Sequence, residues 1–122
     1  MKRSALNPKR STPRRKGTPT PRIKPGRVED PAHLARVRSL PCIACQIGGG
    51  AQTTPTEAHH IRDGQGMGQK AGDHEAIPIC SFHHRTGFNS IHLSPITFQW
   101  LYGTERELLA RTLEALKTME AA

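Results

Sequence analysis

A chain of 122 residues with 34% hydrophobic and 4% aromatic residues has room for one small domain and too little apolar surface for a large core. This composition excludes a fold held by hydrophobic burial alone and predicts either a metal staple or partial disorder. The chain has no run of about 18 apolar residues and no apolar segment after its basic start. We therefore expect a cytoplasmic protein with neither a membrane span nor a secretory signal.

The formal net charge of +8 is concentrated at the start of the chain. Residues 1–28 carry ten Lys or Arg and no acid, whereas residues 29–122 carry eight Lys or Arg and ten acids. Five prolines in the first segment predict an extended, disordered basic arm, followed by one domain over residues 29–122. Such an arm favours a polyanionic partner, most simply nucleic acid, and a solubilising tail is the alternative. The candidate phosphate-binding cations of the arm include Arg10, Arg14, Arg15 and Lys16.

The domain is predicted to open with a short helix. Asp30 is a good N-cap and Pro31 suits the first helical position. A helix over residues 32–39 follows, and Pro41 ends it. We expect His33 on this helix to be an ordinary surface histidine.

A Cys-x-x-Cys pair comes next. Cys42 and Cys45 precede three consecutive glycines at 48–50, which predicts a tight turn with two thiolates facing one ion. A redox pair is the alternative, but such pairs usually open a helix after a strand, and the glycines argue against that arrangement. Three cysteines in total fit a reducing compartment better than a disulfide framework.

Two short strands are predicted around a glycine-rich loop. The first, over 57–61, carries His59 and His60, whose side chains point to opposite faces because neighbours alternate in a strand. The second, over 76–79, leads into Cys80-Ser81-Phe82-His83-His84-Arg85, a turn that opens a short helix ending near Gly87.

The glycine-rich loop spans residues 62–72. It lacks the spacing of a phosphate-binding loop of the nucleotide-hydrolase type, so a flexible segment is the better interpretation. Arg62 and Lys70 in this loop, and Arg85 after the second strand, are candidate contacts to DNA phosphates.

Two helices are predicted to complete the domain. Ser94 and Pro95 start a helix over 95–102 that Gly103 closes, and the capping box of Thr104 and Glu107 starts the longest helix, to about residue 119. Leucines at helical spacing on this last helix predict a core-facing stripe, with a partner surface as the alternative. They are Leu108, Leu109, Leu113 and Leu116.

The cysteines and the histidines divide into two groups of metal-ligand type. Cys42, Cys45, Cys80 and His83 predict a closed tetrahedral zinc site that compensates for the small core, and His84 is an alternative fourth ligand. The remaining histidines suit a divalent ion with open positions, or a base that deprotonates water at a phosphodiester. Surface or outer-shell histidines are the alternative. This second group is His59, His60, His84 and His92.

At these residues the sequence resembles the HNH, or ββα-metal, nuclease family. The order that carries the resemblance is a strand with His-His, a glycine-rich loop, a strand ending in Pro-Ile-Cys, and CxxHH on a helix. The closer resemblance is to the phage Ref type of RecA-dependent HNH nucleases and their small prophage relatives. It covers roughly residues 33–116, with these matches: Ser39-Leu40-Pro41-Cys42-x-x-Cys45, His59-His60-Ile61, Gly64-Gln65-Gly66-Met67-Gly68-x-Lys70-Ala71-x-Asp73, Ile77-Pro78-Ile79-Cys80-x-x-His83-His84, Ile91-His92, Phe98 and Tyr102-Gly103.

The resemblance implies a small α+β fold with a ββα-metal core, a structural zinc and flanking helices. It implies that His60 is the general base and that His59 and His84 bind a catalytic metal ion, for which we expect Mg²⁺, Mn²⁺ or another divalent ion. His92 joins them only if the insertion 85–90 is looped out. The family's central Asn has no clear counterpart; Asp73 is the better match and His74 the alternative, with a role in catalysis or in holding the loop.

The activity that the resemblance implies is DNA endonuclease activity, with DNA and a RecA-type recombinase filament as partners and a phage or prophage origin in a bacterial host. A non-catalytic zinc-stapled module that binds nucleic acid or scaffolds a partner is the competing hypothesis. The two hypotheses differ in whether His59, His60 and His84 need to converge on an open cation site.

Overall fold

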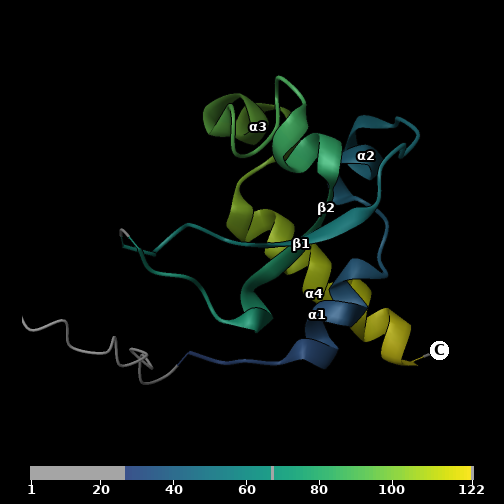
Figure 1. The fold of residues 1–122 in the computed structure, drawn as a ribbon. Helices are drawn as coiled ribbons and strands as arrows, with labels where there is room; N and C mark the ends of the chain where they lie inside the picture. Colours follow the sequence, from purple (N-terminus) through teal and green to yellow (C-terminus); the bar gives the residue numbers. More distant parts are fainter. Residues whose placement is uncertain (1–26, 67, 122) are drawn as a thin grey trace, which may run out of the picture.

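The computed structural model describes residues 27–66 and 68–121, so the predicted arm over 1–28 lies almost wholly outside the described residues. The described chain is a small α+β fold, as expected, with a two-stranded sheet and four α-helices (Figure 1). The elements follow in the order α1 (Pro31–Arg38), α2 (Ile43–Gly48), β1 (Thr56–His60), the one-turn 3₁₀ helix η1 (Asp73–Glu75), β2 (Ala76–Cys80), the π-helical turn η2 (Phe82–Thr86), α3 (Pro95–Tyr102) and α4 (Glu105–Ala121).

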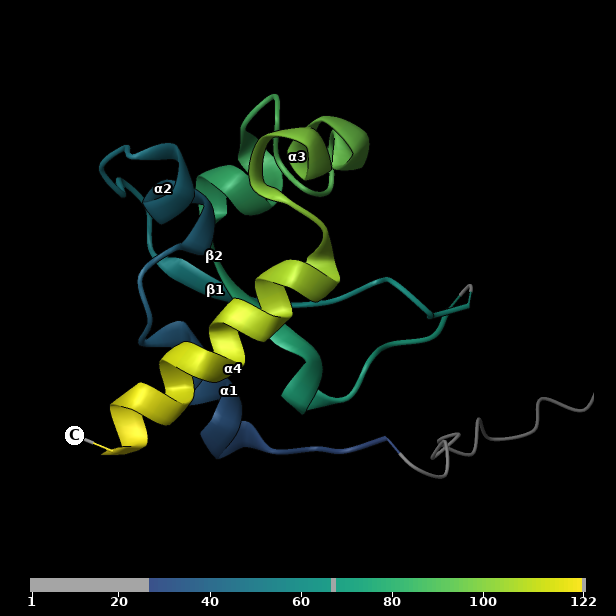
Figure 2. The same ribbon diagram turned by 180° about the vertical axis from the view of Figure 1, so that it is seen from behind.

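Strands β1 and β2 pair antiparallel, with Thr56 opposite Cys80 and His60 opposite Ala76. All five residues of β2 are buried, whereas β1 is mostly half-buried. A two-stranded ribbon is unstable in water without packing against other elements. Here α1 packs against both strands and α4 packs against β2 and α1. Seen from behind, α4 crosses in front of the sheet (Figure 2).

The core lies between the sheet and these helices. Its largest fully buried side chains are apolar, and they come from four elements and the start of the long loop: Val37, Ile61, Ile77, Ile79, Phe98 and Leu108. A second group of elements, α2, η2 and α3, gathers beyond one end of the sheet (Figure 1). This end holds the cysteines and most of the histidines that the sequence singled out.

The predictions for the last two helices are confirmed. Helix α3 has the predicted bounds, and α4 begins with the capping box, in which Glu107 N donates to Thr104 Oγ1 (3.2 Å) and Thr104 N donates to Glu107 Oε2 (3.3 Å). The predicted leucine stripe is correct at Leu108, Leu109 and Leu116. Leu113 is instead 38% exposed.

Two expectations near the start of the domain are wrong. His33 is not a surface residue: it is only 6% exposed, because α1 packs its side against β1, β2 and η1. The Cys-x-x-Cys pair lies at the start of a helix and not in a tight turn alone. Cys42 is the N-cap of the six-residue helix α2, and Gly49, in the left-handed region (φ 72°), is its C-cap. Among the described residues, none of the helices combines the length and the apolar character needed to cross a membrane.

Candidate metal centres

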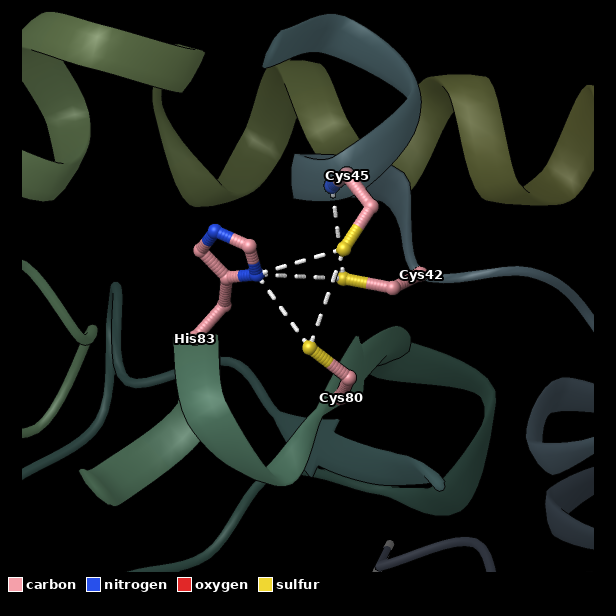
Figure 3. A group of neighbouring side chains, drawn as sticks. All are labelled: Cys42, Cys45, Cys80 and His83. Atoms are coloured by element: carbon pink, nitrogen blue, oxygen red, sulfur yellow. Dashed lines mark hydrogen bonds between the residues drawn. The ribbon is translucent and has the colours of Figure 1, made fainter. Parts of the chain in front are cut away.

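The first centre is the Cys₃His group, assembled from three elements. Cys42 and Cys45 come from the start of α2, Cys80 ends β2, and His83 lies in η2. Their ligand atoms all lie within 4.8 Å of one another, and Figure 3 shows the four side chains pointing toward a common centre. The predicted ligand set is therefore brought together, with His83 rather than His84 as its histidine.

The distances within this group match tetrahedral zinc. Zinc–sulfur bonds of about 2.3 Å and zinc–nitrogen bonds of about 2.0–2.1 Å place sulfurs about 3.8 Å apart and a sulfur about 3.6 Å from the nitrogen. The sulfurs of Cys45 and Cys80 are 3.8 Å apart. Nδ1 of His83 lies 3.7, 3.4 and 3.2 Å from the sulfurs of Cys42, Cys45 and Cys80. The group can bind a metal such as zinc.

The electrostatics of the thiols also call for a cation. Burial raises the pKa of Cys80, but hydrogen bonds from Thr54 and the His83 backbone outweigh it and bring the value to about 6. Burial and the adjacent Cys42 raise the pKa of Cys45 to about 12. The protein's own donors thus stabilise one thiolate, whereas further negative charge in the same buried space requires a bound cation.

The second centre is a cluster of three histidines, His59 from β1, His84 from η2 and His92 from the loop after η2. Nε2 of His84 lies 3.1 Å from Nδ1 of His59 and 3.0 Å from Nε2 of His92. All three ligand atoms lie within 4.8 Å of one another, so the cluster can hold a metal ion. His60 is not part of it.

The loop after η2 explains how His92 reaches this cluster. Ile91 N donates to the His83 carbonyl (2.9 Å) and His92 N donates to the His84 carbonyl (3.2 Å). These bonds fold the chain back along η2 and leave the segment between them looped out. The condition under which the sequence would place His92 at the site is therefore met.

Two of the three rings also contact a carboxylate, through the ring nitrogen that faces away from the cluster. Glu105 Oε2 lies 2.9 Å from Nε2 of His59, and Glu57 Oε1 lies 3.1 Å from Nδ1 of His84. Carboxylates in this outer position fix the tautomer and orientation of metal-binding imidazoles. Neither acid was predicted from the sequence as part of the site. Glu57 had a signal, because residues two apart in a strand share a face with His59; Glu105, 46 positions from His59, had none.

The charges of these acids are stabilised locally. Hydrogen bonds from Arg85 lower the pKa of Glu57. Burial raises the pKa of Glu105, but bonds from His59 and from the Arg62 backbone amide outweigh it, and the net shift is downward. Burial lowers the pKa of His84 more than Glu57 raises it, which favours the neutral ring that a cation requires.

His60 faces a different partner. Its Nε2 lies 2.8 Å from Oδ1 of Asp73, and the His60 side chain is 13% exposed. Asp73, which is 5% exposed, also accepts from the Asp30 backbone amide (2.7 Å), and its own amide donates to the Val28 carbonyl (2.9 Å). The strand alternation thus sends His59 to the histidine cluster and His60 to Asp73. His74 pairs with Asp30 instead, at 3.0 Å.

The predicted DNA contacts have different environments. Lys70 and Arg62 are exposed, although Arg62 donates to the Gln69 carbonyl (2.6 Å). Arg85 is exposed but paired with Glu57, so it supports the His84 ring as well as facing solvent. The four arm cations, Arg10, Arg14, Arg15 and Lys16, lie outside the described residues.

Comparison with known proteins finds a relative and a family for this chain. The chain is 34% identical over 80 residues to the Uncharacterized protein YdfU of Escherichia coli (strain K12), a match that covers 64% of this chain and 20% of YdfU. The chain thus spans about a fifth of the length of that relative. No solved structure matches. The family model described as "Protein of unknown function (DUF968)" matches residues 20–119, and the chain belongs to this family.

Proposed function

We propose that this chain is a metal-dependent DNA endonuclease of the HNH, or ββα-metal, type. The observation that carries the proposal is the cluster of His59, His84 and His92, whose nitrogens converge from three segments while carboxylates hold two of the rings from behind. A closed structural site does not need this arrangement beside a complete Cys₃His group. A divalent cation with open coordination positions does.

The order of the elements supports the assignment to the ββα-metal type. Strands β1 and β2 form an antiparallel pair, and the helical turn η2 follows β2 directly. The adjacent residues His83 and His84 in η2 belong to the two different groups. In this proposal the Cys₃His group binds a structural zinc that fixes η2, and η2 in turn presents His84 to the catalytic cation.

His60 is the proposed general base. With the proton of Nε2 directed at Asp73, Nδ1 keeps its lone pair and can take a proton from water. Asp73 acts as the orienting group, and its own carboxylate is held by the Asp30 backbone amide. Because His60 lies outside the histidine cluster, its lone pair is not used on the cation.

Phosphodiester hydrolysis needs a base for the attacking water and positive charge for the departing 3′ oxygen. His59, His84 and His92 would hold a divalent ion, Mg²⁺, Mn²⁺ or another that accepts imidazole ligands, and the ion would supply that charge. The exposed side chains of Arg62 and Lys70 and the basic arm then bind flanking phosphates. A RecA-type filament as partner is part of the proposal through resemblance alone.

Nicking of supercoiled plasmid by the full-length protein with Mg²⁺ or Mn²⁺ tests the proposal. We expect the wild-type protein to nick the plasmid. His84→Ala should lose cation binding and, with it, nicking activity. His60→Ala should nick about 10²- to 10⁴-fold more slowly than the wild type. His74→Ala is the matched control, because His74 is a histidine outside both groups, and it should nick like the wild type.

Two results would contradict the proposal. Equal nicking by wild type and His60→Ala would remove His60 as the base. DNA binding without nicking in either ion would instead indicate the zinc-stapled nucleic-acid-binding module.

A further inference from the structure

Helix α3 leaves an unusual amount of apolar surface in solvent. Phe98 is its one buried residue, whereas Ile96 is 75% exposed and Trp100 is 85% exposed. These two residues lie one turn apart on the same side of the helix. Leu93, which is 63% exposed, lies two residues before the first residue of α3. We call Leu93, Ile96 and Trp100 the α3 stripe; a contiguous exposed apolar row of this kind marks a binding surface.

Both ends of α3 are attached to the histidine cluster. The stripe begins directly after His92, whose Nε2 lies 3.0 Å from that of His84. Past the other end of α3, Glu105 holds the His59 ring at 2.9 Å. The stripe therefore begins next to the proposed cation site and runs along the helix between His92 and Glu105.

Two hollows lie between Trp100 and Glu105, the carboxylate that accepts from His59, and none of the three cluster histidines lines either hollow. One, of about 290 Å³, is lined by Trp100, Gln99 and Thr104 together with Gly103 and Glu107. The other, of about 520 Å³, is also lined by Gln99 and Thr104, and it reaches Glu105 and the cations Arg62 and Arg106. Because the two hollows share walls, the indole borders a surface path that leads to the carboxylate behind His59.

The charged groups that line the two hollows are the guanidinium groups of Arg62 and Arg106 and the carboxylates of Asp63, Glu105 and Glu107. The sequence has no Asp or Glu between Glu75 and Glu105, a stretch that contains β2, η2 and α3. The carboxylates that line the two hollows all accept hydrogen bonds from neighbouring groups: Asp63 from Arg106, Glu105 from His59 and the Arg62 amide, and Glu107 from the Thr104 amide.

We propose that the α3 stripe is a stacking platform for the unpaired bases of single-stranded DNA. The inference rests on the proposed function: a strand whose phosphate lies at the histidine cluster meets the stripe at Leu93, the residue next to His92. Leucine and isoleucine side chains offer no donor to a phosphate, but they and the indole pack against the flat faces of bases. A regular duplex turns those faces inward and presents charged backbone instead, so the stripe selects DNA with unpaired bases.

The fluorescence of Trp100 provides a direct test, because it is the single tryptophan of the chain. Full-length zinc-loaded protein without Mg²⁺ or Mn²⁺ is titrated with a single strand of about 12 nucleotides, within the usual site size. A duplex and an abasic strand of the same length serve as controls. We expect saturable quenching by the single strand alone, while anisotropy of labelled DNA shows that all three bind through the basic arm.

Variants separate stacking from general DNA affinity. Trp100→Ala should bind the single strand about 5- to 150-fold more weakly, the usual effect of losing one stacked base on an aromatic ring. Trp100→Phe should retain most of the affinity. Leu101→Ala is the matched control, because Leu101 is an exposed apolar residue of α3 (51% exposed) to the side of the row; it should bind like the wild type.

Three outcomes overturn the inference: equal quenching by the abasic strand, equal quenching by the duplex, or no quenching by the single strand. A concentration-dependent shift of Trp100 emission without DNA, together with a doubled mass, would show instead that a second copy covers the stripe. The two measurements also separate failure of the stacking platform from failure of the nuclease proposal. Selective quenching without plasmid nicking leaves a single-strand-binding surface, whereas nicking without selective quenching removes only the platform.

Discussion

His59 and His84 use both ring nitrogens, and this determines which nitrogen faces the cation position. Glu105 accepts from Nε2 of His59, which leaves the lone pair on Nδ1, and Glu57 accepts from Nδ1 of His84, which leaves it on Nε2. These are the two nitrogens that face each other at 3.1 Å. His92 has no carboxylate partner among the described residues. We therefore expect Glu57 and Glu105 to account for most of the preorganisation of the cluster.

Glu105→Gln should weaken cation binding while leaving the fold in place. Glutamine keeps an oxygen for the Arg62 amide but loses the negative charge behind His59. Loss of an outer-shell partner lowers metal affinity by about 10- to 100-fold. Titration calorimetry of the zinc-loaded protein with Mn²⁺ measures the change. Glu114→Gln, on an exposed part of the same helix, is the control. An unchanged Mn²⁺ affinity in Glu105→Gln would show that Glu105 accepts from the Arg62 backbone amide but does not support cation binding.

Among single residues, the candidate metal ligands were easier to predict from the sequence than the acids that orient them. Cysteines and histidines at metal-ligand spacing are informative because few other roles require them. Glu105 was not predictable, since a carboxylate in the first turn of a helix is ordinary and its contact with His59 is made across the fold. His33 was misassigned because its burial follows from the packing of α1 on the sheet, which local sequence does not encode.

Among the elements, the Cys₃His group joins two short helical segments, α2 and η2, to the buried strand β2. It links the start of α2, the end of β2 and η2. Helix α2 has six residues and η2 has five, both too short to be stable alone. A metal such as zinc bound by this group would hold this end of the domain together and, through the adjacent His84, would fix one member of the histidine cluster.

Removal of the zinc should unfold this end of the molecule. Structural zinc contributes about 10–16 kcal/mol of apparent binding free energy in small zinc domains, far more than α2 and η2 gain from their own contacts. We expect a high-affinity chelator to reduce helical circular dichroism and lower the melting temperature, and zinc to restore both. Metal analysis should give one equivalent in wild type and a loss in Cys80→Ser. A chelated protein with unchanged melting would show that the group is not structural.

Element boundaries were predictable where local side chains set them. Ser94 and Pro95 start α3, and the reciprocal bonds of Thr104 and Glu107 start α4, all within a few residues. The α2 helix was missed because the three glycines after the Cys-x-x-Cys pair predicted a tight turn. The π-helical turn of η2 depends on the fold of the following loop onto the His83 and His84 carbonyls.

Across the whole molecule, positive charge and candidate chemistry occupy different parts of the chain. Residues 1–28 carry ten cations and no acid, whereas residues 29–122 have two more acids than cations. The domain therefore has little net charge with which to attract DNA over a distance. In the proposed nuclease, the arm supplies affinity and the histidine cluster supplies chemistry, so changes in each part should alter different measurements.

Neutralising part of the arm should weaken DNA binding in a salt-dependent way. Each phosphate contact contributes about 0.9 to the slope of log affinity against log salt on duplex DNA. The triple change Arg14→Gln, Arg15→Gln and Lys16→Gln should therefore reduce the slope by up to about 2.7, as measured by anisotropy between about 50 and 200 mM salt. The control pair Arg111→Gln and Lys117→Gln, exposed on α4, should leave the slope unchanged. An unchanged slope in the arm variant would identify the arm as a solubilising tail, and the domain would then have to bind DNA through its own cations.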